Sequence, residues 1–398
     1  MGKHSKNKQK LNKKQSSKEN IKYKNNEDIL EKTKKIKPHK HKKLKKIIFS
    51  FLSIIITIFI IIQVIQFLKW QSILKEMCKN QGSVILDENK NVITTLGREK
   101  MHENITQNDI TNNLKNAYIA IEDERYYKHH GVDIKRTSSA IFSYIIHFGS
   151  SSFGGSTITQ QYVKNLTGND SNSINRKVGE WIKAFETEMC MSKDEILCSY
   201  LNIIYVGPNV YGVQMGSKFY FNKDAKDLSL EECAFLAGLN HSPNSYNPFT
   251  EKDNSERIKL RTETVLDKML ELKYISKEEY DEAYTNVENG LNFEKGDLSE
   301  YENSIYSYHT ESIISDITAE ISKKKNISET FATNYLNMAG LKIYSTENTD
   351  IQKKLETEFE KDKYILHSEN DNDATSQAAM VVIDHKTGHV VRNCWFTW

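Results

Sequence analysis

Cysteine is scarce and unpatterned in this sequence. There are five cysteines among 398 residues, an odd number, and they form no CxxC pair and no cluster with histidine. Disulfide frameworks and structural zinc sites both need paired or clustered cysteines, so this spacing argues against either one. We interpret all five as isolated small apolar side chains. They are Cys78, Cys190, Cys198, Cys233 and Cys394.

Proline is also rare, with four in the whole chain, and no internal repeat is visible. Between residues 112 and 283 only Pro208, Pro243 and Pro248 occur, each in a loop-like setting, so long stretches are free to be helical. Three Ser-x-x-Glu capping boxes precede apolar runs with helical spacing, which indicates helix starts and predicts a mostly α-helical domain. The three boxes are Ser192–Glu195, Ser229–Glu232 and Ser276–Glu279.

The net charge of +2 hides an uneven distribution. Residues 1–46 contain 18 lysines and four acidic residues, whereas the remainder of the chain is acidic overall. A segment so poor in apolar residues cannot bury enough surface to offset its ordering entropy, and we predict a disordered basic tail. Its charge alone fits either nucleic acid or anionic lipid.

An uncharged apolar run of 22 residues, 47–68, follows this tail. As a helix it would extend roughly 33 Å, enough to cross the hydrocarbon core of a bilayer. It is too long for a cleaved signal peptide and lacks a small-residue cleavage site, so we predict a transmembrane signal-anchor rather than a buried core helix. The lysines just before the run, Lys42, Lys43, Lys45 and Lys46, should stay cytoplasmic. The tail is therefore predicted to be cytoplasmic, with the membrane and not nucleic acid as its partner.

The segments on either side of the helical domain mix strands and helices. Residues 69–111 are predicted to form a juxtamembrane neck with a β-hairpin near residues 83–96, and the helical domain covers residues 112–285. Residues 286–398 form a C-terminal segment. In that segment we predict helices at 312–325 and 350–359 and strands at 341–346 and 378–384.

A first group of polar residues runs from Glu122 to Gly131. If residues 114–128 form one helix, Glu122, Tyr126 and His129 fall at i, i+4 and i+7 on one face. A carboxylate, a phenol and an imidazole on one stripe fit a functional site, although an ordinary surface face has the same pattern.

A second group is a loop rich in serine and glycine at residues 150–161, with Lys164 shortly after it. Glycines let a backbone approach a ligand closely, and hydroxyl and amide groups suit sugar and phosphate oxygens. Loops of this composition are also common as linkers, so the group alone leaves both interpretations open.

Two further segments follow within a short distance. Arg176 and Glu180 stand at i, i+4 and would form an ordinary surface salt bridge, but together with Lys177 they could also hold a pyrophosphate and assist its departure. Residues 193–207, which include Asn202, have the pattern of an amphipathic core helix with a capped start.

The order and spacing of these four segments resemble the family 51 glycosyltransferase domain of class A penicillin-binding proteins and of monofunctional peptidoglycan glycosyltransferases. That family's pattern reads E-D-x-x-F-x-x-H-x-G, G-x-S-T-I-T-Q-Q, R-K-x-x-E, and K-x-x-I-L-x-x-Y-L-N with a following Y-x-G. Here the four stand at residues 122–131, 154–161, 176–180 and 193–207, with Tyr126 in place of the phenylalanine.

The resemblance implies a mainly α, lysozyme-like domain behind a single N-terminal transmembrane helix, on the outer face of a bacterial cell membrane. It implies polymerisation of lipid II into glycan strands during cell-wall synthesis, with inversion at the anomeric carbon and undecaprenyl pyrophosphate as leaving group. The partners it implies are lipid II, the lipid-linked glycan chain, the membrane and other cell-wall synthesis and division proteins. The sequence requires no cofactor, and the resemblance allows a divalent cation, Mg²⁺ or Mn²⁺.

The same resemblance assigns roles to individual residues. Glu122 matches the general base and Glu180 the second catalytic carboxylate, and Lys164, Arg176 and Lys177 match contacts to the pyrophosphate. All matching substrate-binding positions are Asp123, Tyr126, His129, Ser156, Thr157, Gln160, Gln161, Lys164, Arg176, Lys177 and Asn202.

The C-terminal segment resembles the linker and first strands of a transpeptidase domain. That domain needs a nucleophilic S-x-x-K, an S-x-N and a K-T-G, but Lys386-Thr387-Gly388 has no catalytic serine ahead of it. We therefore expect a small α/β stub of a truncated transpeptidase domain, without transpeptidase activity. Two alternatives remain: a catalytically inactive, truncated membrane scaffold of the cell-wall machinery, and a lytic muramidase, against which the pyrophosphate-type cations argue.

Overall fold

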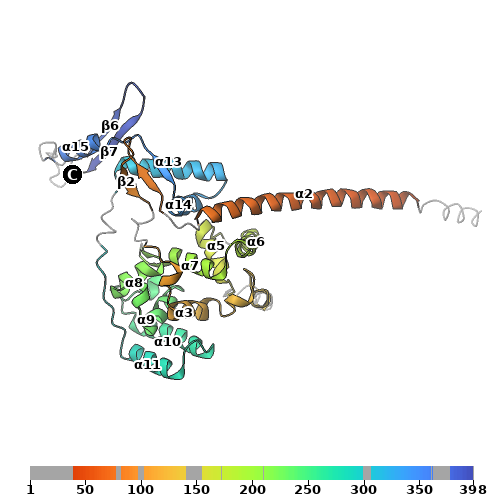
Figure 1. The fold of residues 1–398 in the computed structure, drawn as a ribbon. Coiled ribbons are helices and arrows are strands. Elements are labelled where there is room, and N and C mark those ends of the chain that lie inside the picture. Colours follow the sequence, from red (N-terminus) through yellow and green to blue (C-terminus); the bar gives the residue numbers. More distant parts are fainter. Residues whose placement is uncertain are drawn as a thin grey trace, which may run out of the picture. The chain divides into compact units, whose positions relative to one another are not determined.

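A computed structural model of the chain divides into two compact units, Met1–Leu68 and Lys69–Trp398 (Figure 1). The predicted basic tail lies, up to residue 38, outside the described residues, as do Cys78 and residues 140–154. The described residues are 39–77, 82–96, 103–139, 155–171, 173–208, 210–298, 306–359, 361 and 377–397.

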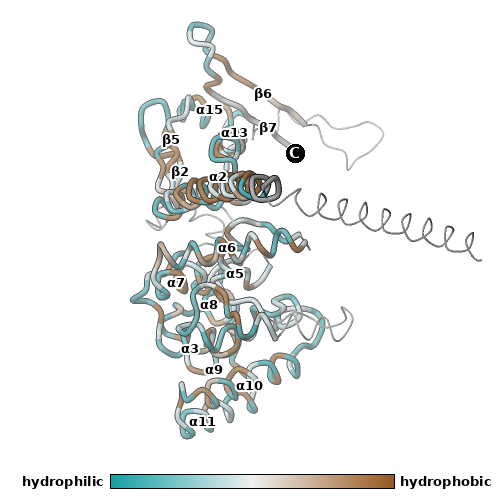
Figure 2. Tube along the Cα trace, turned by 90° about the vertical axis from the view of Figure 1, so that its right-hand side faces the viewer, coloured by the Kyte–Doolittle hydropathy of each residue, from teal (hydrophilic) through white to brown (hydrophobic). Residues whose placement is uncertain are grey.

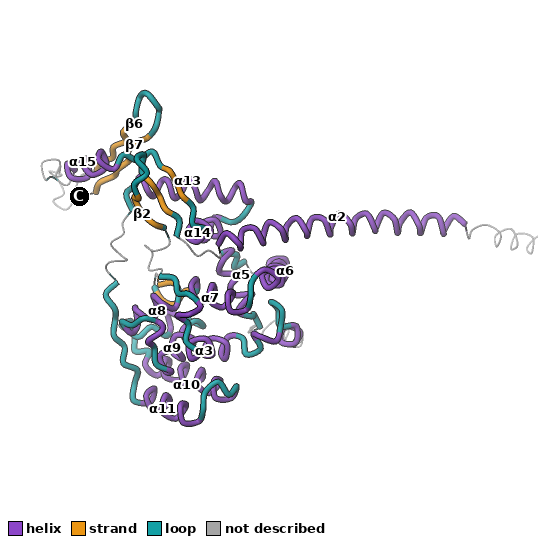
Figure 3. The backbone as a smooth tube through the Cα atoms, viewed as in Figure 1, coloured by secondary structure: helices purple, strands orange, loops and turns teal. Residues whose placement is uncertain are grey.

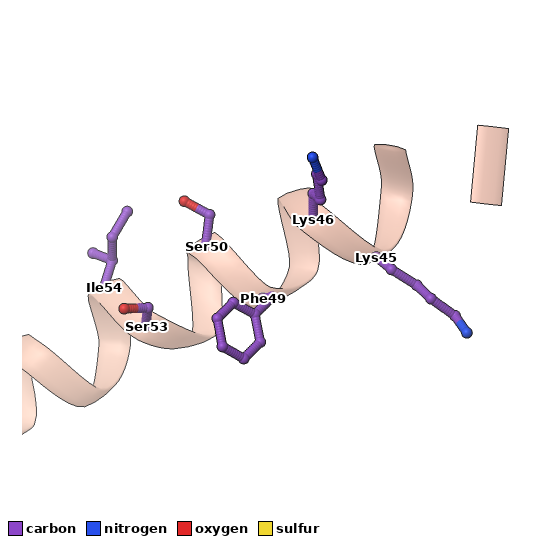
Figure 4. Close-up of a pocket in the computed structure, with 6 residues that line it drawn as sticks. All are labelled: Lys45, Lys46, Phe49, Ser50, Ser53 and Ile54. Atoms are coloured by element: carbon purple, nitrogen blue, oxygen red, sulfur yellow. The ribbon is translucent and has the colours of Figure 1, made fainter. Parts of the chain in front are cut away.

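The predicted apolar run lies within one long helix, α2 (His39–Met77). Side chains along the run are exposed, for example Phe49 at 75% and Ile58 at 52%, and the apolar character of the helix is visible in Figure 2. Figure 4 shows Lys45 and Lys46 projecting outward where the run begins, followed by Phe49 and Ile54. Among the described residues this is the one helix long and apolar enough to cross a membrane, which agrees with the prediction of a single span.

The last turns of α2 are buried in the second unit. Trp70, which is 5% exposed, donates a hydrogen bond from Nε1 to Thr187 Oγ1 at 3.0 Å. Its ring centroid lies 5.4 Å from that of Phe331, and Lys183 Nζ lies 4.9 Å above it. Leu74 and Met77 are also buried. The helix therefore continues beyond the apolar run and becomes part of the core.

The predicted helical domain is present, and its helices begin where the sequence indicated. In each of the three Ser-x-x-Glu boxes the serine side chain accepts a backbone N–H and the glutamate side chain accepts the serine N–H. The domain core is rich in fully buried aromatic side chains, including Tyr118, Tyr220 and Phe235.

The α-helices of this domain are α3 (Asn112–Glu122), α5 (Ile158–Thr167), α6 (Ile174–Cys190), α7 (Lys193–Ile203), α8 (Val213–Phe221), α9 (Leu230–Leu239), α10 (Ser255–Glu271) and α11 (Lys277–Glu288). Its short elements are η1 (Gln107–Asp109), η2 (Tyr126–Lys128), η3 (Ala225–Asp227), η4 (Pro243–Ser245), β3 (Tyr205–Gly207) and β4 (Val210–Tyr211).

The prediction of one helix over residues 114–128 is wrong. Helix α3 ends at Glu122, and Tyr126–Lys128 forms the separate 3-10 turn η2. The break occurs at Asp123, whose backbone has φ −155° and ψ 71°. Its buried carboxylate binds groups that a continuing helix would carry out of reach, so tertiary contacts override the helical spacing.

The C-terminal segment contains the predicted strands and helices, and Figure 3 shows its strands in orange. Strand β1 (Val84–Leu86) pairs antiparallel with β2 (Val92–Thr95), as the predicted hairpin requires, and parallel with β5 (Lys342–Tyr344). The neck and the C-terminal segment therefore share one sheet, which the sequence did not indicate. The other elements are α13 (Tyr308–Lys325), α14 (Glu329–Met338), α15 (Thr349–Phe359), β6 (Gln377–Ile383) and β7 (Val390–Thr397).

Two local features of this segment bear on the predictions, a contact with the helical region and a turn within the β6–β7 hairpin. Helix α14 packs on α5, where Ser328 Oγ donates to Thr167 O at 2.6 Å. The Lys386-Thr387-Gly388 sequence forms the turn of the β6–β7 hairpin: Asp384 accepts from the Lys386 N–H, and Gly388 has φ +73°. A tight turn accounts for these three residues without any catalytic role.

We expect Trp70→Ala to lower the free energy of unfolding by about 3–5 kcal/mol, because it removes a buried indole together with its packing on Phe331. Thermal unfolding of the full chain in detergent, followed by circular dichroism, measures the loss. Tyr344→Ala is the control, since Tyr344 is 63% exposed and should cost about 0.5 kcal/mol or less. Equal losses for the two variants would contradict the burial of the end of α2.

Candidate active site

A polar cavity of about 390 Å³ opens in the helical domain and gathers residues from several predicted segments. They come from the end of α3, the start of α5, the first turns of α6 and the turn after α9. The lining residues are Glu122, Ser156, Gln160, Gln161, Lys164, Arg176, Lys177, Glu180, Asn240 and His241. Eight of these ten were predicted as site residues, and both predicted catalytic carboxylates are among them.

Glu122, the last residue of α3, presents its carboxylate to neutral amide donors. Gln161 Nε2 donates to Glu122 Oε2 at 2.7 Å, and Asn240 Nδ2 donates to Oε1 at 3.0 Å. Arg136 Nη1 donates to the backbone carbonyl of Glu122 at 3.0 Å. The side chain is half-buried, so the carboxylate is held in place and still faces the cavity.

Glu180 is surrounded by cationic side chains, whereas Glu122 is surrounded by neutral amides. Arg176 Nη1 donates to Glu180 Oε2 at 2.6 Å, Lys177 Nζ forms an ion pair with Oε1, and Gln160 Nε2 donates to Oε1 at 3.3 Å. Lys177 Nζ also donates to Ser156 Oγ at 2.8 Å. Glu180 is only 6% exposed. The Arg176–Glu180 ion pair is therefore part of a partly buried charge cluster with Lys177 rather than an ordinary surface salt bridge, and breaking it would leave the buried Glu180 carboxylate with fewer partners.

Asp123 connects the first two predicted segments. Its carboxylate, 1% exposed, accepts from the backbone N–H of Ile158 at 3.0 Å and from His129 Nε2 at 2.9 Å. Thr157 Oγ1 also donates to Gly131 O at 2.6 Å and accepts from Gln160 N as the N-cap of α5. These bonds hold the start of α5 against the residues that follow α3.

Several predicted substrate-binding residues lie in the structure around the cavity and do not line it. Tyr126 is buried and donates from its hydroxyl to Lys193 O at 2.7 Å, and burial raises the pKa of that hydroxyl far above its ordinary value. Asn202 exchanges two hydrogen bonds of 2.9 Å with the backbone of Ile105. Asp123, His129 and Thr157 likewise bind protein groups.

Two cavity residues were not predicted from the sequence. Asn240 and His241 directly follow α9, which is a mostly apolar helix. Polar residues are common just beyond the end of any helix. No local signal distinguishes them. Their placement depends on the packing of α9 against α3 and α10, which brings the end of α9 beside Glu122.

Two further predictions concern features that the described residues do not decide. Gly154 and the serines before it, which belong to the second predicted segment, lie outside the described residues. Within the described part of the chain, no group of three or more histidine, cysteine or acidic side chains is placed to hold a metal ion. Binding of a divalent cation stays a prediction.

Comparisons with known proteins identify sequences similar to this chain. Residues 89–270 match the family model described as Transglycosylase. The chain is 35% identical over 324 residues to "Penicillin-binding protein 1A" of Clostridium perfringens (strain 13 / Type A), covering 78% of this chain and 47% of that protein. It is 36% identical over 318 residues to the protein of the same name in Clostridium botulinum (strain Langeland), covering 78% of this chain and 38% of that protein. The chain thus spans less than half the length of these relatives.

A solved structure, that of penicillin-binding protein 1A from Haemophilus influenzae, is similar over 70% of this chain and 28% of its own. Its sequence identity is 21% and its TM-score is 0.31, which is too low to support a conclusion about the fold.

We expect Asp123→Asn to lower the free energy of unfolding by about 1–3 kcal/mol, because it removes the charge that strengthens the bonds from Ile158 and His129 and replaces one buried acceptor oxygen with an NH2 donor. Thermal unfolding of the full chain measures this. Asp194→Asn is the matched control: its side chain is 54% exposed and pairs with Lys115, so it should cost about 1 kcal/mol or less. A loss no greater than the control's would show that Asp123 does not join the two segments.

Proposed function

We propose that this chain is a peptidoglycan glycosyltransferase that polymerises lipid II into glycan strands of the cell wall, and the match of residues 89–270 to the Transglycosylase family model supports this. The observation that carries the proposal is one cavity with two carboxylates in opposite surroundings. Glu122 is bound by neutral amides, and Glu180 is bound by two cations. This asymmetry suits a reaction that removes a proton at one point and releases an anion at another.

Glu122 is the proposed general base. In the reaction, the 4-hydroxyl of one lipid II attacks the anomeric carbon of the growing chain, and Glu122 takes the hydroxyl proton as the new bond forms. Both carboxylate oxygens are held by amide donors, which restricts the side chain to the orientation facing the cavity. A positioned base of this kind contributes about 10²–10⁴ in rate.

The cations at the other carboxylate are the proposed site of the leaving group. As the bond from the anomeric carbon to undecaprenyl pyrophosphate breaks, negative charge grows on the pyrophosphate, and Lys164, Arg176 and Lys177 line the cavity to stabilise it. Attack opposite the leaving group inverts the anomeric centre. Since Glu180 already orients Arg176 and Lys177, these side chains need little rearrangement. We propose that they supply the charge stabilisation and that Mg²⁺ or Mn²⁺ is not obligatory.

We further propose that the domain works at the outer surface of a bacterial cell membrane, with α2 as a single-pass anchor and the N-terminus cytoplasmic. The exposed face of α6 supports contact with lipid. Apolar side chains recur along it every three or four positions, between 42% and 83% exposed, where a soluble domain would carry polar residues. They are Ile174, Val178, Ile182, Phe185 and Met189.

We expect Glu122→Gln to reduce polymerisation by about 10²–10⁴-fold, because glutamine keeps the shape but cannot take the proton. Labelled lipid II incubated with the full chain in detergent, with products separated by length, measures the effect. Glu124→Gln is the matched control two positions away, on an exposed side chain. If a folded, monodisperse parent made no chains, the alternative of an inactive membrane scaffold would replace the proposal.

Lys164→Met tests the leaving-group side. Lys164 is exposed at the cavity wall, so the substitution should leave the fold intact while removing one charged contact, which lowers kcat/KM for lipid II by about 10–100-fold. Lys128→Met, at another exposed lysine of the domain, should retain the parent's rate. Equal rates for the two variants would exclude Lys164 from binding the pyrophosphate.

A further inference from the structure

Asn240, at the end of α9, contacts the proposed base directly, with its Nδ2 3.0 Å from Glu122 Oε1. We propose that Asn240 is a positioning residue that fixes the Glu122 carboxylate in the orientation that receives the acceptor's proton. This inference rests on the proposed glycosyltransferase function, and it adds a role for a residue that the four predicted segments do not contain.

The contact belongs to a closed ring of four side chains. Gln161 Nε2 donates to Glu122 Oε2 at 2.7 Å, and Gln161 Oε1 accepts from the Tyr200 hydroxyl at 3.1 Å. The hydroxyl in turn accepts from Asn240 Nδ2 at 2.9 Å, and Asn240 completes the ring at Glu122. Each amide thus donates to one oxygen of the carboxylate, and both amides are oriented by the same hydroxyl.

The Glu122 carboxylate only accepts hydrogen bonds, so both amides turn an NH2 group toward it, and this sets the direction of the two bonds made by the hydroxyl of Tyr200. Its side chain is fully buried, and burial, with the nearby charge of Glu122 as a second cause, holds the pKa of the hydroxyl well above its ordinary value. The hydroxyl therefore stays protonated. It donates a hydrogen bond to Gln161 Oε1 and accepts one from Asn240 Nδ2. A flip of the Asn240 amide would lose two hydrogen bonds at once and would turn an oxygen toward the carboxylate.

The helix that carries Asn240 is itself firmly held. Arg261 Nε donates to Gly238 O at 3.0 Å, and the hydroxyl of Tyr118 in α3 donates to Leu236 O at 3.0 Å. A Cβ at Gly238 would lie 3.0 Å from Arg261 Cγ, so α9 and α10 approach closely there. Because α3 also ends at Glu122, the base and Asn240 sit at the ends of two helices packed on each other.

Three variants of the full chain in detergent test the role, with kcat and KM for lipid II polymerisation as the readout. Asn240→Ala removes the donor and should lower kcat about 10- to 100-fold while KM changes by roughly twofold or less, since substrate contacts remain. Asn240→Asp keeps the shape but places a second carboxylate against Glu122, and its kcat should be lower still. Asn286→Ala removes a similar amide-to-carboxylate bond, to Glu231 at 3.1 Å outside the cavity, and should match the parent.

The order of the two Asn240 variants decides between positioning and packing. A residue that only fills space would tolerate the isosteric aspartate better than alanine, so a more active Asn240→Asp overturns the proposal. Parent-like kcat in Asn240→Ala also overturns it. The half-buried polar site should leave the melting temperature of Asn240→Ala close to the parent's, so a kcat loss with an unchanged melting curve supports positioning. A parent that makes no chains refutes the proposed function and this inference together, whereas an active parent with active Asn240 variants refutes this inference alone.

Discussion

The carboxylate of Asp123 is the constraint on which the geometry of the cavity depends. It is buried at 1% exposure and binds the Ile158 N–H and His129 Nε2, so the chain must leave the helical path immediately after Glu122. A buried carboxylate without such partners would be strongly unfavourable, which is why the turn and the start of α5 are fixed together. Glu122 and the residues at the start of α5 can face one cavity only because this neighbour holds them there.

The carboxylate of Glu180 positions charged side chains, whereas that of Asp123 positions the backbone. Glu180 is surrounded by Arg176 and Lys177 on the same helix, and its side chain is 5% exposed against 16% and 31% for the two cations. Burying a carboxylate and partly burying its two cations is costly, and replacing a buried ion pair with apolar residues often stabilises a protein. Its presence beside an open cavity is better explained by function: the carboxylate keeps two cations oriented toward a site where further negative charge is expected to develop.

The sequence predicted features that depend on residues close together in the chain, and it did not predict those that depend on distant residues. The capping boxes at Ser192, Ser229 and Ser276 depend on residues three positions apart, and all three form as expected. The apolar run is equally local, and it appears as the exposed part of α2. Within the site, the two carboxylates and three cations that the family resemblance named all line one cavity.

The features that were missed depend on distant parts of the chain. The end of α3 at Glu122 depends on Ile158, 35 positions after Asp123. The pairing of β1 with β5 joins residues more than 250 positions apart, and no pattern in either strand specifies its partner. Asn240 reaches Glu122 across 118 positions. In each case a residue with an unremarkable local setting is placed by helix or strand packing that only the folded chain supplies.

The contact between α2 and α6 extends this dependence to the residues that follow the apolar run. Thr187, which accepts the Trp70 indole N–H, lies seven positions after Glu180 on α6, which is about 10 Å or two helical turns. The same helix therefore carries the end of α2 at one place and the paired cations at another. Trp70 also packs on Phe331 of α14, so the end of α2 contacts both α6 and α14. The residues that follow the apolar run therefore belong to the same compact unit and the same core as α6, the helix that carries the paired cations.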